Sequence, residues 1–303
     1  MINFILIIVC ISLGFLVKYR RLVPTDAHKG INSWIINIAL PAVSFKYLPK
    51  VTWTTDMVFP ILAMFILAFG AFIYIYLYQK IKGYSIRTAC SLWLAAGFAN
   101  TSFIGFPLVS AYFGEPALSI AVICDQTMFL ILSTFGVIYS IKASTPGTGG
   151  IDWRFIMWRL LKFPPFMACI TALLIGLFAV DITMVEPLFD KLAATLGPLA
   201  LFSIGLQLSF KGWQKKISQI SVVVFYKLAV GPALVLFIAF LISRNSEIAR
   251  ITVFETAMPT LVTSGILAEQ FKLKASLVNL VIGVSILLGF ATTGVWYLIL
   301  SYL

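Results

Sequence analysis

The sequence predicts an all-α integral membrane protein with ten transmembrane helices, arranged as two inverted five-helix repeats whose fourth and ninth helices are broken. Three observations predict this architecture: the composition, the spacing of apolar segments, and two interruptions at corresponding places. Of the 303 residues, 61% are hydrophobic and 11% are charged, whereas soluble domains carry about 25% charged residues. Most of the chain is therefore expected to lie in a lipid bilayer as a multi-pass protein.

Ten apolar segments are long enough to be interpreted as spans, because about 20 apolar residues cross the hydrocarbon core as a helix. They are Ile2–Val17, Ile31–Tyr47, Met57–Tyr78, Thr88–Phe113, Ala117–Ile141, Phe163–Val180, Pro187–Leu208, Ile217–Ile242, Glu247–Gln270 and Ser276–Tyr302. These segments predict one transmembrane domain, residues 1–303, with a first repeat at 1–142, a polar linker at 143–152 and a second repeat at 153–303.

Positive charge is distributed unevenly between the two sets of loops. Sixteen of the 22 lysine and arginine residues fall in loops after odd-numbered segments, five in the opposite loops, and one inside a segment. Since cytoplasmic loops carry the excess of Lys and Arg, both termini are expected on the non-cytoplasmic side. With five segments in each half, two related halves insert with opposite orientation, as in many secondary transporters.

Composition and motifs also exclude several classes of function. The basic residues behind the net charge of +11 lie in scattered short loops, so no nucleic-acid partner is expected. The four cysteines lack CxxC spacing and have no histidine nearby, so neither a metal nor another cofactor is expected. The sequence contains no HExxH, GxSxG or Walker A motif, which argues against an enzyme and against ATP-driven transport.

Two apolar segments are interrupted by polar and helix-disrupting residues at corresponding places in the two halves. The first interruption covers residues 97–107 and the second covers residues 257–265. Inside a bilayer, such a break is tolerated only where protein or a water-lined cavity satisfies the freed backbone groups. A pair of interrupted segments in corresponding positions is the best sequence indicator of a transporter's substrate site.

The first interruption carries a motif that resembles a known family. It reads Asn100-Thr101-Ser102-Phe103-Ile104-Gly105-Phe106-Pro107-Leu108, followed by Tyr112-Phe113-Gly114. This motif resembles the fourth span of auxin efflux carrier family proteins, which include plant auxin carriers and bacterial malate- or malonate-type permeases. Further resemblance, which covers essentially the whole chain, lies in Asp125-Gln126, Leu201-Phe202-Ser203-Ile204-Gly205-Leu206, Ala257-Met258-Pro259 and Leu267-Ala268-Glu269-Gln270-Phe271.

The resemblance implies a ten-helix carrier in which spans four and nine unwind and cross near the membrane midplane, beside an anionic substrate. It also suggests a homodimer. The short loop between spans five and six matches bacterial members, which implies the inner (cell) membrane of a bacterium. One departure is Ser264, where the plant pattern has a second proline, and a Ser-Gly pair loosens a helix less decisively than proline does.

The residue types at the two interruptions are suited to binding a carboxylate. Half-helix N-termini attract anions, and amide and hydroxyl groups donate hydrogen bonds to a carboxylate without trapping it by charge. The predicted substrate-binding residues are Asn100, Thr101, Ser102, Pro107, Pro259, Thr260, Thr263 and Ser264. The alternative interpretation is that Asn100 and Pro107 only form a locally packed kink.

Three ionisable residues lie within predicted spans, where buried charge is expensive and by default indicates function. Asp125, with Gln126 beside it, is a candidate site for a coupling proton or sodium ion, or else a brace for the crossover. Lys227 is expected to be a counter-ion for Asp125 or Glu255, or the positive partner of the substrate. Glu255 is interpreted either as a proton site or as a structural cap.

The sequence therefore predicts a secondary carrier of small organic anions, such as dicarboxylates or auxin-like carboxylates, that works by alternating access. One alternative is a sodium-coupled symporter of the bile-acid type, which shares the broken-helix plan. A second alternative is a membrane receptor without transport activity. A channel is disfavoured, because no ring of pore-lining charge is visible in the sequence.

Overall fold

A computed structural model describes residues 2–24, 26–51, 54–144, 153–207, 213–242 and 246–302. All regular structure in these ranges is helical, apart from an isolated antiparallel β-bridge between Ala99 and Thr260. Of the predicted linker at 143–152, the first two residues end a helix, and residues 145–152 lie outside the described ranges.

Helices lie on all of the predicted apolar segments. In the first half of the chain they are α1 (Ile2–Tyr19), α2 (Ala27–Trp34), α3 (Leu40–Tyr47), α4 (Val58–Lys82), α5 (Ile86–Ala96), α6 (Phe106–Phe113), α7 (Leu118–Ile131) and α8 (Val137–Ser144). In the second half they are α9 (Trp153–Leu161), α10 (Pro164–Leu177), α11 (Glu186–Ala194), α12 (Leu196–Gln207), α13 (Ile217–Phe225), α14 (Gly231–Leu241), α15 (Glu247–Thr256), α16 (Val262–Gln270) and α17 (Ala275–Ser301).

Short 3₁₀ and π turns extend or join several of these helices. They are η1 (Ile35–Ala39), η2 (Leu48–Lys50), η3 (Thr55–Met57), η4 (Thr101–Gly105), η5 (Glu115–Ala117), η6 (Leu132–Gly136), η7 (Trp213–Lys216) and η8 (Tyr226–Val230). Joined in this way, α13, η8 and α14 form one continuous helical stretch, and η5, α7, η6 and α8 form another.

Five helical stretches in the described residues are long and apolar enough to cross a membrane. They are Thr55–Lys82, Glu115–Ser144, Glu186–Gln207, Ile217–Leu241 and Ala275–Ser301. Shorter apolar helices lie at Ile5–Tyr19, Thr101–Phe113 and Pro164–Leu177. The structure thus agrees with the predicted all-helical class and with a multi-pass membrane protein.

The chain divides into two compact units. Unit 1 comprises Met1–Thr54, Ser102–Gln126 and Trp158–Leu208. Unit 2 comprises Thr55–Thr101, Thr127–Met157 and Ser209–Leu303. Each unit therefore takes segments from both predicted repeats, and the chain passes from unit 2 to unit 1 within the first interrupted segment.

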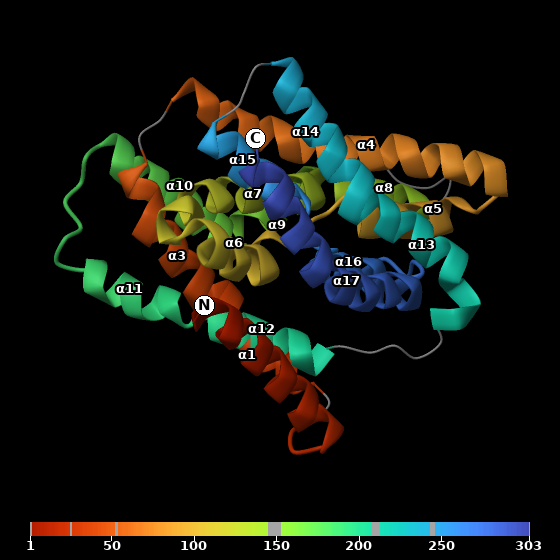
Figure 1. Cartoon of the computed structure of the whole chain (residues 1–303), viewed down its shortest axis with the longest axis horizontal. Coiled ribbons are helices and arrows are strands. Elements are labelled where there is room, and N and C mark those ends of the chain that lie inside the picture. The colour runs from red at the N-terminus through yellow and green to blue at the C-terminus, as the bar shows by residue number, and fades with distance from the viewer. Residues whose placement is uncertain are drawn as a thin grey trace. The chain divides into compact units, whose positions relative to one another are not determined.

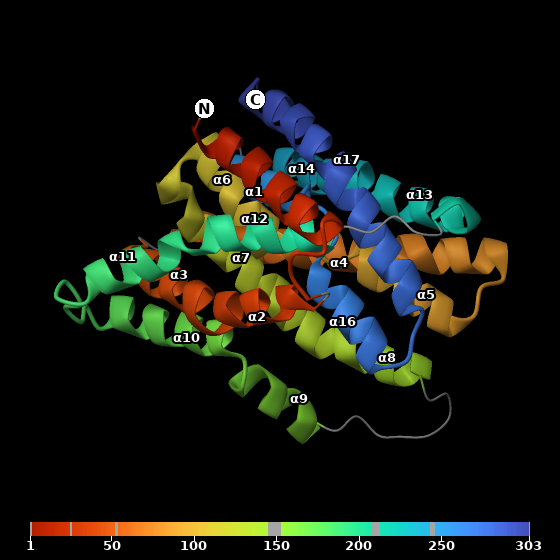
Figure 2. The same cartoon turned by 90° about the horizontal axis from the view of Figure 1, so that it is seen from below.

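In unit 1, α1 and α12 run side by side (Figures 1 and 2). A Cβ atom on Gly14 of α1 would lie 2.2 Å from the carbonyl oxygen of Phe202, and a Cβ atom on Gly205 of α12 would lie 2.3 Å from that of Ile11. Both distances are shorter than a van der Waals contact, so the two backbones touch only because both positions lack a side chain. Small residues serve this purpose in membrane helix pairs.

In unit 2, the stretch Ile217–Leu241 contains the π turn η8 just before Pro232. Proline has no N–H, so the carbonyl of Leu228, four residues earlier, cannot receive its helical hydrogen bond. The indole Nε1 of Trp296 in α17 donates to that carbonyl at 2.8 Å. A side chain from another helix therefore satisfies the acceptor that the proline leaves open.

Replacing Gly14 with alanine is expected to lower the stability of the protein. The added methyl group forces α1 away from α12, and overpacking of this kind typically costs about 1–3 kcal/mol. The matched control is Gly30→Ala in α2, where a Cβ atom meets nothing within 4 Å. Thermal unfolding of both variants in detergent checks the prediction, and equal stability of Gly14→Ala and the unmodified protein would contradict it.

Candidate functional site

The chain leaves helical structure at both interruptions that the sequence contains. α5 ends before residues 97–100, and α15 ends before residues 257–261. Pro259 lies in the second gap, where its missing N–H is compatible with the end of a helix. Ser264 lies inside α16, so α15 ends without the second proline of the plant pattern.

The two non-helical stretches pair with each other inside unit 2. The N–H of Asn100 donates to the carbonyl of Pro259 at 2.8 Å, and the N–H of Leu261 donates to the carbonyl of Phe98 at 3.0 Å. These bonds flank the β-bridge described above. Backbone groups at the end of a helix lack hydrogen-bond partners within that helix. These two bonds supply partners to such groups at the break.

Three side chains add hydrogen bonds around this break. Thr260 Oγ1 donates to the carbonyl of Ala95 at 2.8 Å, and the hydroxyl of Ser285 accepts from the N–H of Thr260 at 3.1 Å. Lys227 Nζ donates to the carbonyl of Thr256 at 2.9 Å. Ala95 and Thr256 lie in the last turns of α5 and α15, where carbonyl groups lose their helical donors.

The structure brings Asn100, Pro259 and Thr260 into direct contact, with Thr101 next along the chain. The side chains of Asn100, Thr101 and Thr260 are completely buried. Two further predicted residues, Thr263 and Ser264, lie in the first turn of α16. This part of unit 2 therefore gathers amide and hydroxyl side chains at a broken helix, and such groups can donate hydrogen bonds to a carboxylate. The hydroxyl of Thr260 itself already donates to the carbonyl of Ala95.

The hydroxyl of Ser264 is completely buried and has no hydrogen-bond partner among the described residues. Buried polar groups almost always have a partner, so this hydroxyl keeps an unused capacity for one.

Two of the predicted ionisable residues also lie in unit 2. Lys227 in η8 and Glu255 in the last turn of α15 are both completely buried. The Nζ of Lys227 donates to the carbonyl of Thr256, the residue that follows Glu255 in the chain. The counter-ion role predicted for Lys227 is compatible with Glu255 as its partner.

The remaining predicted residues, Ser102, Pro107, Asp125 and Gln126, belong to unit 1. Asp125 and Gln126 are adjacent in α7 and largely buried, and the Gln126 amide donates to Asp125 Oδ2 at 3.2 Å. Within the described residues, no group of three or more His, Cys, Asp and Glu side chains is placed to hold a metal ion.

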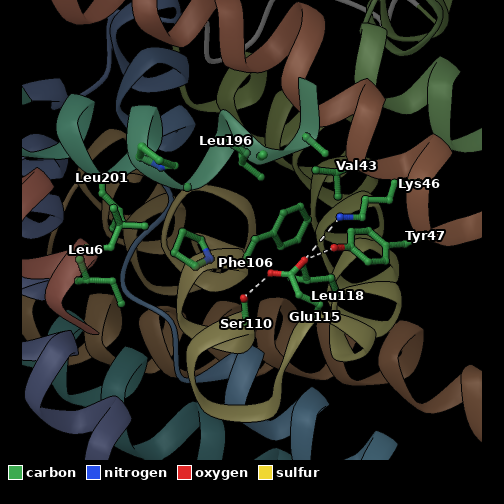
Figure 3. Close-up of a pocket in the computed structure, with 16 residues that line it drawn as sticks. Leu6, Val43, Lys46, Tyr47, Phe106, Ser110, Glu115, Leu118, Leu196 and Leu201 are labelled. Carbon is green, nitrogen blue, oxygen red and sulfur yellow. Dashed lines mark hydrogen bonds and ion pairs between the residues drawn. The ribbon is translucent and has the colours of Figure 1, made fainter. Parts of the chain in front are cut away.

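Unit 1 also contains a cavity of about 230 Å³ that the sequence does not predict (Figure 3). Its wall is largely apolar, and Pro107 contributes to it. The apolar residues labelled in Figure 3 come from α1, α3, α6, α7 and α12, namely Leu6, Val43, Phe106, Leu118, Leu196 and Leu201.

One end of this cavity is polar and centred on the carboxylate of Glu115. Ser110 donates to Glu115 Oε1 at 2.7 Å, and the hydroxyl of Tyr47 donates to the same carboxylate. Lys46 Nζ lies 3.7 Å from Glu115 Oε2 (Figure 3). The same Nζ lies 3.3 Å from Asp190 Oδ1. Because two carboxylates already balance the charge of Lys46, this cavity is a weaker candidate for binding an anion than the break in unit 2.

Replacing Thr260 with valine is expected to destabilise the break. The substitution keeps the shape of the side chain but leaves the buried Ala95 carbonyl without its donor, at a cost of about 1–3 kcal/mol. The matched control is Thr171→Val. The hydroxyl of Thr171 donates to the carbonyl of Met167 in the same helix, on an exposed face. Thermal unfolding in detergent measures the difference, and a Thr260→Val variant as stable as the control would be inconsistent with the bond.

The chain is similar in sequence to known membrane transport proteins. The family described as "Membrane transport protein" matches residues 1–145 and 153–297. An uncharacterised transporter of Methanothermobacter thermautotrophicus is 24% identical over 297 residues, which cover 97% of this chain and 96% of the relative. The Rhizobium meliloti protein named "Putative malonate transporter" is 26% identical over 318 residues, with 96% and 93% coverage.

A plant relative matches a shorter part of the chain. The Oryza sativa subsp. japonica protein named "Probable auxin efflux carrier component 9" is 27% identical over 169 residues, which cover 53% of this chain and 39% of that protein. The family match extends over nearly the whole chain and includes both interrupted segments. The chain therefore belongs to the auxin efflux carrier family of membrane transport proteins.

Proposed function

We propose that the protein is a secondary active carrier of small organic anions, with ten transmembrane helices in two inverted repeats and alternating access around a midplane site. The observation that carries this proposal is the paired break in unit 2, where α5 and α15 end and their non-helical continuations bond each other. A membrane protein that needed only mechanical stability would gain nothing from two broken helices at this point.

The proposed substrate is a carboxylate that binds beside Asn100. Asn100 and Thr101 supply an amide and a hydroxyl on one side of the break, and the first turn of α16 supplies Thr263 and Ser264. The N-terminus of α16 adds a partial positive charge that favours an anion. The names of two relatives, one an auxin efflux carrier and one a malonate transporter, are both compatible with a carboxylate substrate.

The proposed orientation places both termini on the non-cytoplasmic side of a bacterial inner (cell) membrane. Its support is the excess of Lys and Arg in the loops after odd-numbered segments. A homodimer is compatible with this arrangement.

For energy coupling we propose a proton or sodium gradient, with Asp125 as the residue that binds the coupling ion. Asp125 lies within the stretch Glu115–Ser144 and is largely buried beside Gln126. A carboxylate in that setting is costly unless it has a function. The competing possibility, a sodium-coupled symporter of the bile-acid type, shares the broken-helix plan and differs in its dependence on sodium.

Replacing Asn100 with alanine is expected to reduce anion flux at least about tenfold, because a hydrogen bond to a charged group contributes roughly 1.5–3 kcal/mol. The assay is uptake of labelled malate, malonate and indole acetate into proteoliposomes. Asn37→Ala is the matched control, since the Asn37 amide donates to the carbonyl and hydroxyl of Ser33 on an exposed face. Normal flux through folded Asn100→Ala protein would reject the site.

Replacing Asp125 with asparagine is expected to remove the dependence of uptake on the driving gradient, because the neutral amide cannot bind and release a proton or neutralise a sodium ion. Uptake is measured with a proton gradient, a sodium gradient, or neither. The matched control is Asp181→Asn. Asp181 is exposed, and its carboxylate accepts hydrogen bonds from the N–H and the hydroxyl of Thr183. Full gradient-driven uptake by Asp125→Asn would make Asp125 structural.

A further inference from the structure

Lys227 is held in a fixed position by its neighbours along η8. The hydroxyl of Tyr226 donates to the carbonyl of Leu67 in α4 at 2.8 Å, and Trp296 bonds the carbonyl of Leu228. The residues immediately before and after Lys227 are therefore anchored to two other helices of unit 2. A π turn of this kind often marks a functional position.

The side chain of Lys227 reaches the broken end of α15. Its Nζ donates to the carbonyl of Thr256, the last residue of that helix, at 2.9 Å. The final carbonyls of a helix carry a partial negative charge, and the Glu255 carboxylate adds to it. Lys227 is completely buried, so its contact with the end of α15 lies inside the protein, away from solvent.

In carriers built from broken helices, the C-terminal ends of half-helices and the carbonyls of unwound segments coordinate the coupling Na⁺ or H⁺. The end of α15 is the C-terminal end of a half-helix of this kind. Here the amino group of Lys227, rather than a free cation, contacts its last carbonyl. An ammonium group is a compact point charge with three donors. It can therefore satisfy the same carbonyl oxygen that a bound cation would.

We propose that Lys227 is a tethered cation that takes the place of a bound cation at the end of α15. The intact side chain keeps free cations out of this position. When the side chain is shortened, the position becomes a site for a small monovalent cation, with a primary ammonium ion preferred. The consequence for transport, that the end of α15 does not take up Na⁺ during the cycle, rests on the proposed carrier function.

The test is cation-dependent thermal unfolding of the purified full chain in detergent. Lys227→Ala removes the atoms from Cγ to Nζ, which n-propylammonium reproduces. We expect n-propylammonium chloride to raise the Tm of Lys227→Ala by at least about 2 °C relative to choline chloride at equal ionic strength. The unmodified protein should show no difference between these salts, because Lys227 already occupies the position.

Two further variants separate charge from packing. Lys227→Met fills the same space without a charge or a donor, so it should be destabilised and should not respond to n-propylammonium. Lys216→Ala removes a lysine of unit 2 whose Nζ bonds Ser276 at 2.9 Å on an exposed surface. This control should show no preference among the salts.

A Lys227→Ala protein that unfolds at the same Tm in n-propylammonium and in choline would overturn the proposal. If this variant is recovered only as aggregate, purification with n-propylammonium present should restore monodisperse protein, and failure to do so would also overturn it. The readout involves no transport. If the unmodified protein transports an acid but Lys227→Ala shows no response to n-propylammonium, the tethered-cation proposal alone is rejected. If Lys227→Ala responds to n-propylammonium but the unmodified protein transports none of the acids, the carrier function alone is rejected.

Discussion

The pairing of two non-helical stretches in unit 2 is the constraint on which the rest of the candidate site depends. Backbone groups freed by breaking α5 and α15 inside a membrane need partners in the protein or in a water-lined cavity. The N–H of Asn100 and the carbonyl of Pro259 do so directly. Side chains serve three further backbone groups at the break. Thr260 and Lys227 donate to the carbonyls of Ala95 and Thr256, and Ser285 accepts from the N–H of Thr260.

Much of the helical architecture could be predicted from the sequence, because an apolar segment long enough to cross a bilayer has few alternatives to a helix. The places of the two interruptions were equally predictable, since proline and clustered polar residues are conspicuous in apolar surroundings. Their lengths were not, because the chain is non-helical only at residues 97–100 and 257–261, within the expected 97–107 and 257–265. The end of α15 at Thr256 also shows that one proline suffices, because tertiary hydrogen bonds replace the helical ones that it removes.

Other features could not be predicted, because they depend on partners far apart in the chain. Ser285 is one hydroxyl in the long apolar helix α17, and only its contact with Thr260 reveals its role. A polar residue in the middle of an apolar segment was the only available signal. The cluster around Glu115 has no signal in the sequence, because its members come from three separate segments with no shared spacing: Lys46 and Tyr47 from α3, Glu115 from η5, and Asp190 from α11.

The indole of Trp296 that bonds the carbonyl opened by Pro232 has an evolutionary consequence. Neither residue is advantageous alone: the proline without the tryptophan leaves a buried acceptor unsatisfied, and the tryptophan without the proline loses its polar partner. Relatives in which position 232 is not proline are therefore released from the requirement for a donor at position 296. The two positions should change together during divergence, although they lie on different helices.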